Sequence, residues 1–333
     1  MFNYRDIYFT PQYCKIYENN GDGLLRNFTM NSKYGKVYYN FLLREIDWLI
    51  DNKRYYDITT PYGYGGPLFY DYRTEEDLEC LILEFKEKFE QYCQENDIVS
   101  EFIRFHPLIK NYLFMDNYME INYIRDTVYI KLDSEEQIWH DITSKCRNMI
   151  RKAEKNNISI ELDNSQESLR IFIKLYNMTM VKNNASPYYF FKDKFFYDTM
   201  DLLKGNIYIF NAIYDNKVIS SALIMKYNEF AHYYFSGSDP EYLTLAPNNL
   251  LLYKVALWAY ENGCKYFHLG GGYLGNNDSL FKFKKSFSKN NLLKFYIGKK
   301  IHNKEIYIKL TEEWEKVNNN KEKKNNFFPI YRA

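Results

Sequence analysis

Residues 231–272, AHYYFSGSDPEYLTLAPNNLLLYKVALWAYENGCKYFHLGGG, place a strand, a loop, a helix and a second strand in succession. The aromatic residues at the start predict a strand over residues 231–237. The apolar stretch that follows predicts a helix over residues 248–262, which Gly263 ends. Residues 266–269 are the second predicted strand, and three glycines come directly after it. A strand, a helix and a returning strand are typical of a mixed α/β unit.

The same order of elements occurs twice along the chain. Two strands, over residues 207–214 and 218–227, precede the quoted stretch, and turn sequences predict hairpins between them. The first part of the chain has three strands, a glycine-rich turn, a helix over residues 74–96 and a strand over residues 98–105. The repeat is one of elements and not of residues. We predict two α/β halves with mixed sheets, at residues 1–132 and 133–300, followed by a C-terminal helix and polar tail at residues 301–333.

The composition is that of a globular protein, with 46% hydrophobic and 26% charged residues. Lys and Arg number 44 and Asp and Glu number 43, so the net charge is +1. This balance argues against a dedicated nucleic-acid-binding protein, and we expect no DNA partner. The five cysteines include no C-x-x-C pair, so the sequence predicts neither disulfides nor a metal site. It also predicts no signal peptide and no membrane span, and we therefore expect a cytoplasmic protein.

Three short stretches carry more specific information. The first is CRNMIRKAEKN at residues 146–156. The second is YYFSGSDP at residues 233–240, which NNLL follows at residues 248–251. The third is LGGG at residues 269–272, which DSLFKFKKSF follows at residues 278–287. Taken in this order, they resemble the Fem-type peptidoglycan aminoacyltransferases and their relatives in the GNAT acetyltransferase superfamily.

The resemblance implies two tandem GNAT-like domains and a reaction that transfers an acyl group to an amine. Fem enzymes usually carry Asp-Pro where this chain has His106-Pro107, and the coiled-coil arm that some of them insert is missing here. Enzymes of this fold that use acetyl-CoA carry a Gln/Arg-x-x-Gly-x-Gly/Ala loop, for which TPYGYG at residues 60–65 is the nearest match. The donor therefore stays open between acyl-CoA and aminoacyl-tRNA, in either case a co-substrate and not a permanently bound cofactor.

A glycine-rich turn lies between a strand and a helix of the first half, at Tyr62, Gly63, Tyr64, Gly65 and Gly66. Glycines lack Cβ atoms, so their backbone N–H groups can approach a phosphate or a substrate closely. The alternative is a tight turn that requires positive φ angles. We interpret the turn as a donor- or substrate-binding loop.

The second half has a further glycine run and a candidate catalytic lysine. Three successive glycines, Gly270, Gly271 and Gly272, are unfavourable for stability because glycine loses much conformational entropy on folding. Their presence therefore indicates either close approach of a substrate or a bulge at the strand end. The resemblance places Lys284 at the reacting centre. A lysine can stabilise the oxyanion that forms when an amine attacks a carbonyl. The alternative for Lys284 is a place on a basic amphipathic helix.

The apolar pattern predicts one helix over residues 134–157, and this helix has a positive face formed by Arg147, Arg151 and Lys152. Arginine can bind phosphate through two hydrogen bonds, as in a nucleotide-linked precursor, a lipid-linked diphosphate or tRNA. Charged faces of helices are also often simply solvated. Both interpretations stay open for this helix.

His106 is the candidate acid–base residue of the first half, because it ends a strand and its pKa suits proton transfer. The alternative is a structural histidine, which is how we interpret His232 and His268. The motifs that carry the resemblance add further substrate-binding candidates, namely Arg104, Ser236, Gly237, Asn249 and Phe283.

Together these features predict an acyltransferase that transfers an acyl or aminoacyl group to an amine on a cell-envelope or sugar-linked precursor. No Ser–His–Asp or Cys–His set is recognisable, and direct attack by the acceptor amine requires none. Two alternatives stay open: an aminoacyl-tRNA-dependent enzyme of peptidoglycan bridge synthesis, and a protein that binds a precursor without catalysis. The expected partners are a small-molecule or precursor substrate, tRNA in the first alternative, and peripheral contact with a lipid-linked precursor.

Overall fold

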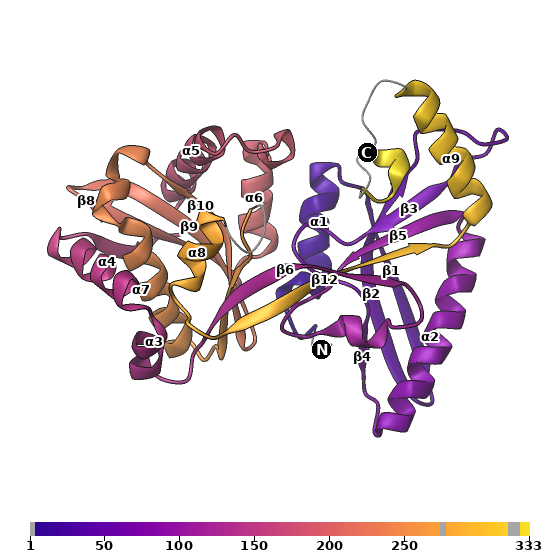
Figure 1. Ribbon diagram of the computed structural model, residues 1–333, viewed down its shortest axis with the longest axis horizontal. Helices are drawn as coiled ribbons and strands as arrows, with labels where there is room; N and C mark the ends of the chain where they lie inside the picture. The colour runs from indigo at the N-terminus through magenta and orange to yellow at the C-terminus, as the bar shows by residue number, and fades with distance from the viewer. Residues whose placement is uncertain (1–3, 274–277, 319–326) are drawn as a thin grey trace. The chain divides into compact units, whose positions relative to one another are not determined.

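The chain folds into two compact units, which are drawn in Figure 1. The computed structural model describes residues 4–273, 278–318 and 327–333. Unit 1 comprises Met1–Ile7 and Arg125–Lys294, and unit 2 comprises Tyr8–Ile124 and Phe295–Ala333. Two strands, β6 (Glu120–Lys131) and β12 (Leu292–Ile301), contribute residues to both units. Within the described ranges, no helix combines the length and the apolar character needed to cross a bilayer.

The sheet of unit 1 is mixed, with the strand order β6-β11-β10-β9-β8-β7. β8, β9 and β10 form an antiparallel meander, and β10 pairs in parallel with β11. β11 then pairs antiparallel with β6, and β7 pairs antiparallel with β8. The bounds are Ser159–Leu162 for β7, Ile207–Tyr214 for β8, Lys217–Tyr227 for β9, Phe230–Ser238 for β10 and Tyr266–Gly270 for β11.

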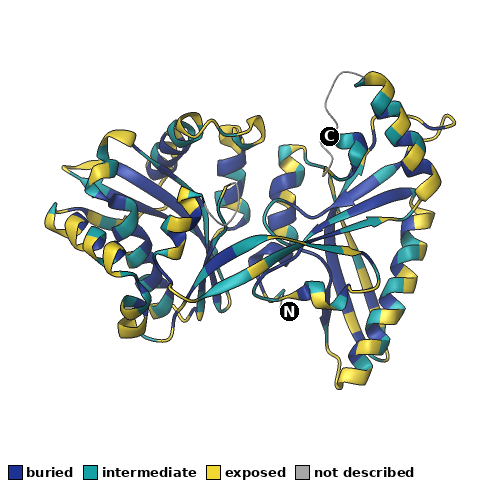
Figure 2. Ribbon diagram, viewed as in Figure 1, coloured by how far each residue is buried: buried dark blue, intermediate teal, exposed yellow. Residues whose placement is uncertain are grey.

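Two sets of helices pack on this sheet. α3, α4, α7 and α8 share one hydrophobic core with it, and Figure 2 draws the central strands of the sheet largely in dark blue, the colour of buried residues. α5 and α6 pack around Phe235 of β10, whose ring centroid lies 5.5 Å from that of Tyr176 and 6.2 Å from that of Phe196. The bounds are Glu135–Asp141 for α3, Ser144–Lys155 for α4, Gln166–Lys182 for α5, Asp193–Leu202 for α6, Pro247–Glu261 for α7 and Ser279–Lys285 for α8.

Residues 134–157, which the hydrophobic pattern predicts as one helix, form the two helices α3 and α4. Ile142 takes an extended conformation with ψ 135°, so α3 ends there. The side chain of Thr143 then caps α4 by accepting a hydrogen bond from the backbone N–H of Cys146. The apolar stripe continues across the break, which is why periodicity alone does not reveal it.

Unit 2 has the strand order β1-β2-β3-β5-β12, and β4 pairs with β2. β3 and β5 are parallel, whereas β1 with β2, β2 with β3 and β5 with β12 are antiparallel. The strands are β1 (Leu24–Ser32), β2 (Gly35–Glu45), β3 (Tyr56–Thr59), β4 (Leu68–Tyr70) and β5 (Ile98–Arg104), and the helices are α1 (Pro11–Asn20), α2 (Glu75–Glu95) and α9 (Lys304–Val317).

The two units confirm the predicted mixed α/β class and the repeat of elements. In each, an antiparallel meander ends in a strand that pairs in parallel with the strand after the next long helix. The parallel pairs are β3 with β5 around α2, and β10 with β11 around α7. The same layout of elements therefore gives the same local topology twice.

The boundaries of the units lie elsewhere than the predicted 132/133 and 300/301. The apolar face of α9 is buried in unit 2, where Leu310, Trp314 and Tyr331 share a core with Ile46 and Val99. The C-terminal helix therefore belongs to unit 2 and is not a separate segment. The predicted polar tail falls largely on residues 319–326, outside the described residues.

Candidate active site

In unit 1, the neighbouring strands β10 and β11 pair over a short length only. Their last parallel pair joins His232 to His268. Beyond it, β10 continues to Ser238 paired with β9, and β11 continues to Gly270 paired with β6. A register shift follows the last pair in each strand, and such bulges often lie beside functional sites. Ligands of open α/β sheets bind at the carboxyl ends of strands, so the place where β11 ends and separates from β10 is the candidate site of unit 1.

Lys284 of α8 lies where β10 and β11 stop pairing. Its Nζ donates a hydrogen bond of 2.8 Å to the carbonyl of Gly271, just after β11, and lies 5.8 Å from the ring centroid of Tyr233 in β10. The side chain is buried, with 9% of its surface exposed. Burial lowers the pKa of Lys284 from 10.5 to about 8; the charge of Asp278 raises it and that of Arg125 lowers it further. The predicted catalytic lysine is thus a buried amine next to the diverging strands.

Tyr233 is the first residue of β10 beyond the parallel pairing. Burial raises the pKa of its phenol to about 12, while a hydrogen bond with the Ser236 side chain acts in the opposite direction. The phenol is therefore protonated near neutral pH and can donate a hydrogen bond. Ser236, a predicted substrate-binding residue, thus lies with Lys284 around the same tyrosine.

The predicted glycine run forms the wall of this site on the β11 side. Gly270 has φ +76°, a conformation that favours glycine. A Cβ on Gly271 would lie 2.9 Å from Cδ of Arg125 in β6. The guanidinium Nη1 of Arg125 donates to the carbonyls of Gly272 and Tyr273, at 2.7 and 3.2 Å. The glycines therefore let two cationic side chains, Lys284 and Arg125, reach the backbone.

Three other candidates of the second half occupy packing positions. A Cβ on Gly237 would lie 2.2 Å from the backbone nitrogen of Tyr176, so glycine lets α5 approach β10. The amide of Asn249 donates to Sγ of Cys146 at 3.3 Å and joins α7 to α4. Phe283 packs with Phe287, at 5.4 Å between ring centroids, against the core of unit 1. These contacts account for the three residues without a ligand.

The basic residues of α4 lie on its outer side. The guanidinium groups of Arg147 and Arg151 lie over the ring of Trp139, at 5.9 and 5.2 Å from its centroid. Lys152 is exposed. None of the three forms an ion pair with a carboxylate in the part of the chain that the structure describes. This surface is thus a cationic face with an aromatic centre, separate from the residues around Lys284.

The glycine-rich turn of unit 2 is filled by side chains of its own unit. A Cβ on Gly63 would lie 2.5 Å from the ring of Tyr8, and one on Gly66 would lie 2.9 Å from the amide of Asn111. The backbone N–H of Gly65 donates to the carbonyl of Arg104 at 2.8 Å. The carbonyl of Tyr62 accepts from the Tyr13 hydroxyl, and the ring of Tyr64 packs 5.1 Å from that of Tyr8. Close packing within unit 2 is therefore sufficient reason for glycine here.

His106 and Arg104 also make structural contacts in unit 2. His106 is fully buried, and its Nδ1 accepts a hydrogen bond of 3.1 Å from the backbone N–H of Ile109. Arg104 donates to the carbonyl of Thr60 at 3.2 Å and lies over the ring of Phe102. Because Nδ1 is occupied as an acceptor, the prediction that His106 is an acid–base catalyst gains no support from these contacts.

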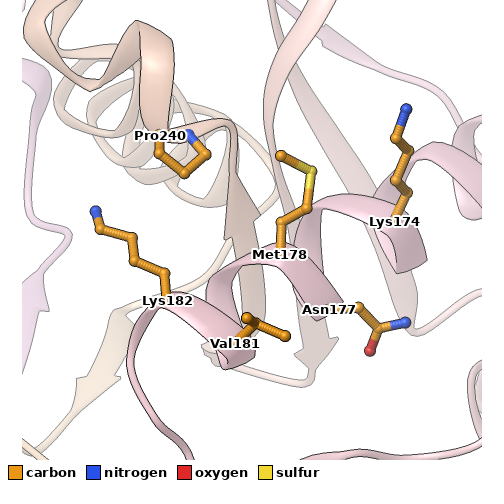
Figure 3. A pocket seen from close by; sticks show the side chains of 6 residues that line it. All are labelled: Lys174, Asn177, Met178, Val181, Lys182 and Pro240. Carbon is orange, nitrogen blue, oxygen red and sulfur yellow. The ribbon is translucent and has the colours of Figure 1, made fainter.

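A pocket of about 610 Å³ lies on unit 1 away from these residues (Figure 3). Its walls are apolar for the most part, and five of the six side chains that line it come from α5. They are Lys174, Asn177, Met178, Val181 and Lys182, with Pro240 from the 3-10 helix η4 (Pro240–Leu245) after β10. None of the predicted site residues lines this pocket.

Sequence reasoning missed Tyr233 and Arg125. Tyr233 lies in the quoted YYFSGSDP stretch, but the sequence does not tell which of its two adjacent tyrosines faces Lys284. Arg125 belongs to no motif, and only the contact of β6 with the glycine run reveals it. The run of three glycines was the available signal, because it allows a bulky neighbour to approach the backbone.

One family model matches part of the second half of the chain. Residues 142–285 match the family model of the acetyltransferase (GNAT) domain. This range holds β10, β11 and Lys284. No curated protein matches the sequence significantly.

Solved structures extend the likeness to most of the chain. FemX has a TM-score of 0.69 and 14% identity, over 91% of this chain and 94% of FemX. The L-PGS from Bacillus licheniformis has a TM-score of 0.53 and 12% identity, over 87% and 91%. The C-terminal domain of a putative lysylphosphatidylglycerol synthetase from Agrobacterium fabrum has 0.52 and 13%, over 84% and 85%. The chain therefore shares the fold of FemX over most of its length, and residues 142–285 match the model of the acetyltransferase (GNAT) domain.

Proposed function

We propose that this protein transfers an acyl or aminoacyl group to an amine on a cell-envelope or sugar-linked precursor. The observation that carries the proposal is the buried amine of Lys284, held between Gly271 and Tyr233 where β10 and β11 stop pairing. A cation in such a place can stabilise negative charge that develops on a reacting carbonyl. The match of residues 142–285 to the acetyltransferase (GNAT) domain supports the same class of reaction.

In the proposed reaction, the acceptor amine attacks the carbonyl carbon of the donor. A C–N bond forms, the carbonyl oxygen becomes an oxyanion, and the C–S or C–O bond to the donor then breaks. The proton lost by the amine leaves with the departing thiolate or alkoxide. With a pKa of about 8, Lys284 is mainly protonated near pH 7 and stabilises the oxyanion, while the Tyr233 hydroxyl donates a hydrogen bond.

Two donors fit this reaction, and both act as co-substrates. Acyl-CoA is favoured by the GNAT domain match. Aminoacyl-tRNA is favoured by the cationic face of α4, where Arg147 and Arg151 lie over Trp139 without a carboxylate partner among the described residues. The aminoacyl-tRNA donor would make the protein an enzyme of peptidoglycan bridge synthesis.

The likeness in fold to FemX and to a putative lysylphosphatidylglycerol synthetase supports an acceptor in the cell envelope, with a lipid-linked precursor in peripheral contact. The cytoplasm is the compartment we propose for the reaction.

The test is a transfer assay on the purified full chain, read by mass spectrometry of the products. Acetyl-CoA and charged tRNA serve as donors, and UDP-MurNAc-pentapeptide serves as the acceptor. We expect Lys284→Met to lower the rate roughly 10²–10³-fold, the effect of removing one oxyanion-stabilising group. Lys282→Met, an exposed position on the same helix, is the matched control and keeps the wild-type rate. Equal rates in both variants would remove Lys284 from the mechanism.

The alternative of a non-catalytic precursor-binding protein predicts a different result. A precursor that binds only the folded state raises the thermal midpoint by an amount set by its concentration and Kd. Binding without product, for every donor tested, would favour this alternative. Lys284→Met would then change the affinity for the precursor, and there would be no rate to lose.

A further inference from the structure

Two cations lie where β10 and β11 stop pairing, and neither has a carboxylate partner among the described residues. Lys284 is buried and Arg125 is half-buried. Within residues 4–273, 278–318 and 327–333, neither side chain forms an ion pair with an Asp or Glu. Residues 274–277 read Leu, Gly, Asn and Asn, so the stretch between Tyr273 and Asp278 adds no acidic side chain. Buried charges are normally paired, because an unpaired one is expensive to take out of water.

Backbone carbonyls hold both cations in place. Gly271 accepts from Lys284, and Gly272 and Tyr273 accept from Arg125. A carbonyl carries only a partial charge, so the positive charge of the two side chains is not cancelled. Asp278 is the carboxylate that acts most on Lys284, and one of its oxygens already caps α8 at the N–H of Phe281, at 2.7 Å. The surroundings of Lys284 and Arg125 therefore keep an excess of positive charge.

The hydrogen-bonding capacity of Arg125 is only partly used. Its bonds to the described residues go through Nη1, and its buried Nε has no hydrogen-bond partner. A buried donor without an acceptor destabilises the fold, because the group has lost its hydrogen bonds to water. Gly271 is what lets this side chain lie along the backbone, since a Cβ there would be 2.9 Å from Cδ of Arg125. The chain thus makes room for an arginine whose Nε donor has no acceptor among the described residues.

We propose that Arg125 and Lys284 form a binding site for an oxyanion group, a phosphate or a carboxylate, on a substrate of the reaction. An arginine offers paired N–H donors that match both groups, and a second cation beside it increases the affinity. The two side chains come from different elements, Arg125 from β6 and Lys284 from α8, and both donate to carbonyls of the glycine run. The assignment of the anion to a substrate rests on the proposed function; the anion site itself does not.

The test measures binding of simple anions to the full chain at constant ionic strength. Inorganic phosphate, pyrophosphate and acetate are titrated separately, with thermal midpoint and calorimetry as readouts. We expect saturable binding of at least one anion, and a weakening of roughly ten-fold or more in Arg125→Gln, as the loss of a charge-assisted hydrogen bond implies. Arg125→Lys keeps the charge and retains part of the affinity. Arg170→Gln, which removes an exposed arginine paired with Glu167, is the control and binds as the wild type does.

A second readout follows the amine itself. In protein labelled with [¹³Cε]lysine, the resonance missing from Lys284→Met reports the titration of Lys284. Because Arg125 lowers the pKa of Lys284, we expect that pKa to rise in Arg125→Gln and to rise in the wild type when the anion binds. This readout also reports on Arg125→Gln without any need for catalysis.

The outcomes separate the two claims. Binding of phosphate or pyrophosphate alone identifies a phosphate group, and binding of acetate alone identifies a carboxylate. Absence of saturable binding, or equal affinity in Arg125→Gln and the wild type, would overturn the site. Arg125-dependent binding without any acyl transfer would leave the anion site intact and contradict the proposed function, and transfer without anion binding would do the reverse.

Discussion

Lys284 is one of three lysines on α8, and burial separates it from the other two. Lys282 and Lys285 are exposed, whereas the Nζ of Lys284 is directed to the carbonyl of Gly271. Loss of water around the amine lowers its pKa to about 8. The same residue type on the same helix therefore has a different chemistry, because one side chain points toward the ends of β10 and β11. The sequence left open that Lys284 is only one of several solvated lysines on a basic amphipathic helix. That interpretation fits Lys282 and Lys285, but not the buried Lys284.

The depressed pKa of Lys284 predicts a pH dependence of stability. Its pKa is 10.5 in the unfolded chain and about 8 in the folded protein, so the unfolded state binds more protons between these pH values. The free energy of unfolding of the wild type should therefore rise with pH from 8 to 10.5, relative to Lys284→Met. Urea unfolding at several pH values measures this, with Lys282→Met as the control. A difference between wild type and Lys284→Met that stays constant over this window would contradict the shift.

At the scale of elements, the contact of α5 with β10 depends on one glycine. The backbone of α5 at Leu175 and Tyr176 lies so close to β10 that a Cβ on Gly237 would be 2.3 and 2.2 Å away. Backbone atoms cannot move aside as the end of a flexible side chain can. The YYFSGSDP stretch thus owes its glycine to helix–strand packing, while Tyr233 and Ser236 of the same stretch face the candidate site.

Gly237→Ala should therefore destabilise unit 1. The added methyl group forces α5 away from β10, and overpacking of this kind destabilises by about 1–3 kcal/mol or more. Gly205→Ala is the control, because a Cβ there meets nothing within 4 Å and only its φ of +83° is unfavourable. Chemical denaturation gives the free energy of unfolding of both variants. It compares the steric clash in Gly237→Ala with the unfavourable φ angle in Gly205→Ala. Equal losses would show that α5 adjusts without difficulty.

A buried charge network joins three elements of unit 2. His302, after β12, bridges Glu90 of α2 and Glu101 of β5, at 3.1 and 3.3 Å. Burial alone would lower the pKa of His302, but hydrogen bonds with Cys93, Glu101 and Glu90 raise it to about 11. Burial would raise the pKa of Glu90, but its bonds to His302 and Lys300 lower it to about 2. Both shifts stabilise the charged forms in the folded state.

This network predicts a loss of stability at alkaline pH. The raised pKa of His302 contributes stability that is complete below pH 6.5 and is lost as the pH rises through about 11. The lowered pKa of Glu90 contributes stability above pH 4.5 that is lost as the pH falls through about 2. His302→Gln should therefore abolish the decline between pH 6.5 and 11 in urea unfolding of the wild type. A decline of the same size in both proteins would mean that His302 is neutral in the folded state.

At the scale of the whole molecule, the end of the chain is part of unit 2. Leu310 and Trp314 of α9 and Tyr331 near the C-terminus are buried in one core with Ile46 and Val99. The sequence shows α9 as an amphipathic helix, but amphipathicity does not say which unit covers the apolar face. The prediction of a separate segment at residues 301–333 did not anticipate that this helix packs into the core of unit 2.

Leu310→Ala should destabilise unit 2 by about 2–5 kcal/mol, the range for removing a buried leucine side chain. Ile308→Ala is the matched control on the same helix, since Ile308 is 48% exposed and its loss leaves no cavity. Thermal unfolding followed by circular dichroism compares the two. A small effect of Leu310→Ala, similar to that of Ile308→Ala, would show that α9 docks weakly.

The sequence by itself determined the elements, their order and the class of the fold. Periodicity and turn residues are local, so the meander, the helix of residues 248–262 and the returning strand could be predicted from residues 207–269. The motif that carries Lys284 was also local, because its residues are close in the chain. The break at Ile142 was missed, because the apolar stripe runs on through it.

Only the tertiary structure decided which residues share a site. Tyr233 lies on β10, Gly271 follows β11 and Lys284 lies on α8. Arg125 comes from β6, far earlier in the chain. Whether a glycine binds a ligand or makes room for a neighbour depends on what packs against it: Tyr8 at Gly63, the backbone of α5 at Gly237, and Arg125 at Gly271. Sequence spacing carries no record of such contacts, because they form between segments that meet only when the sheet is assembled.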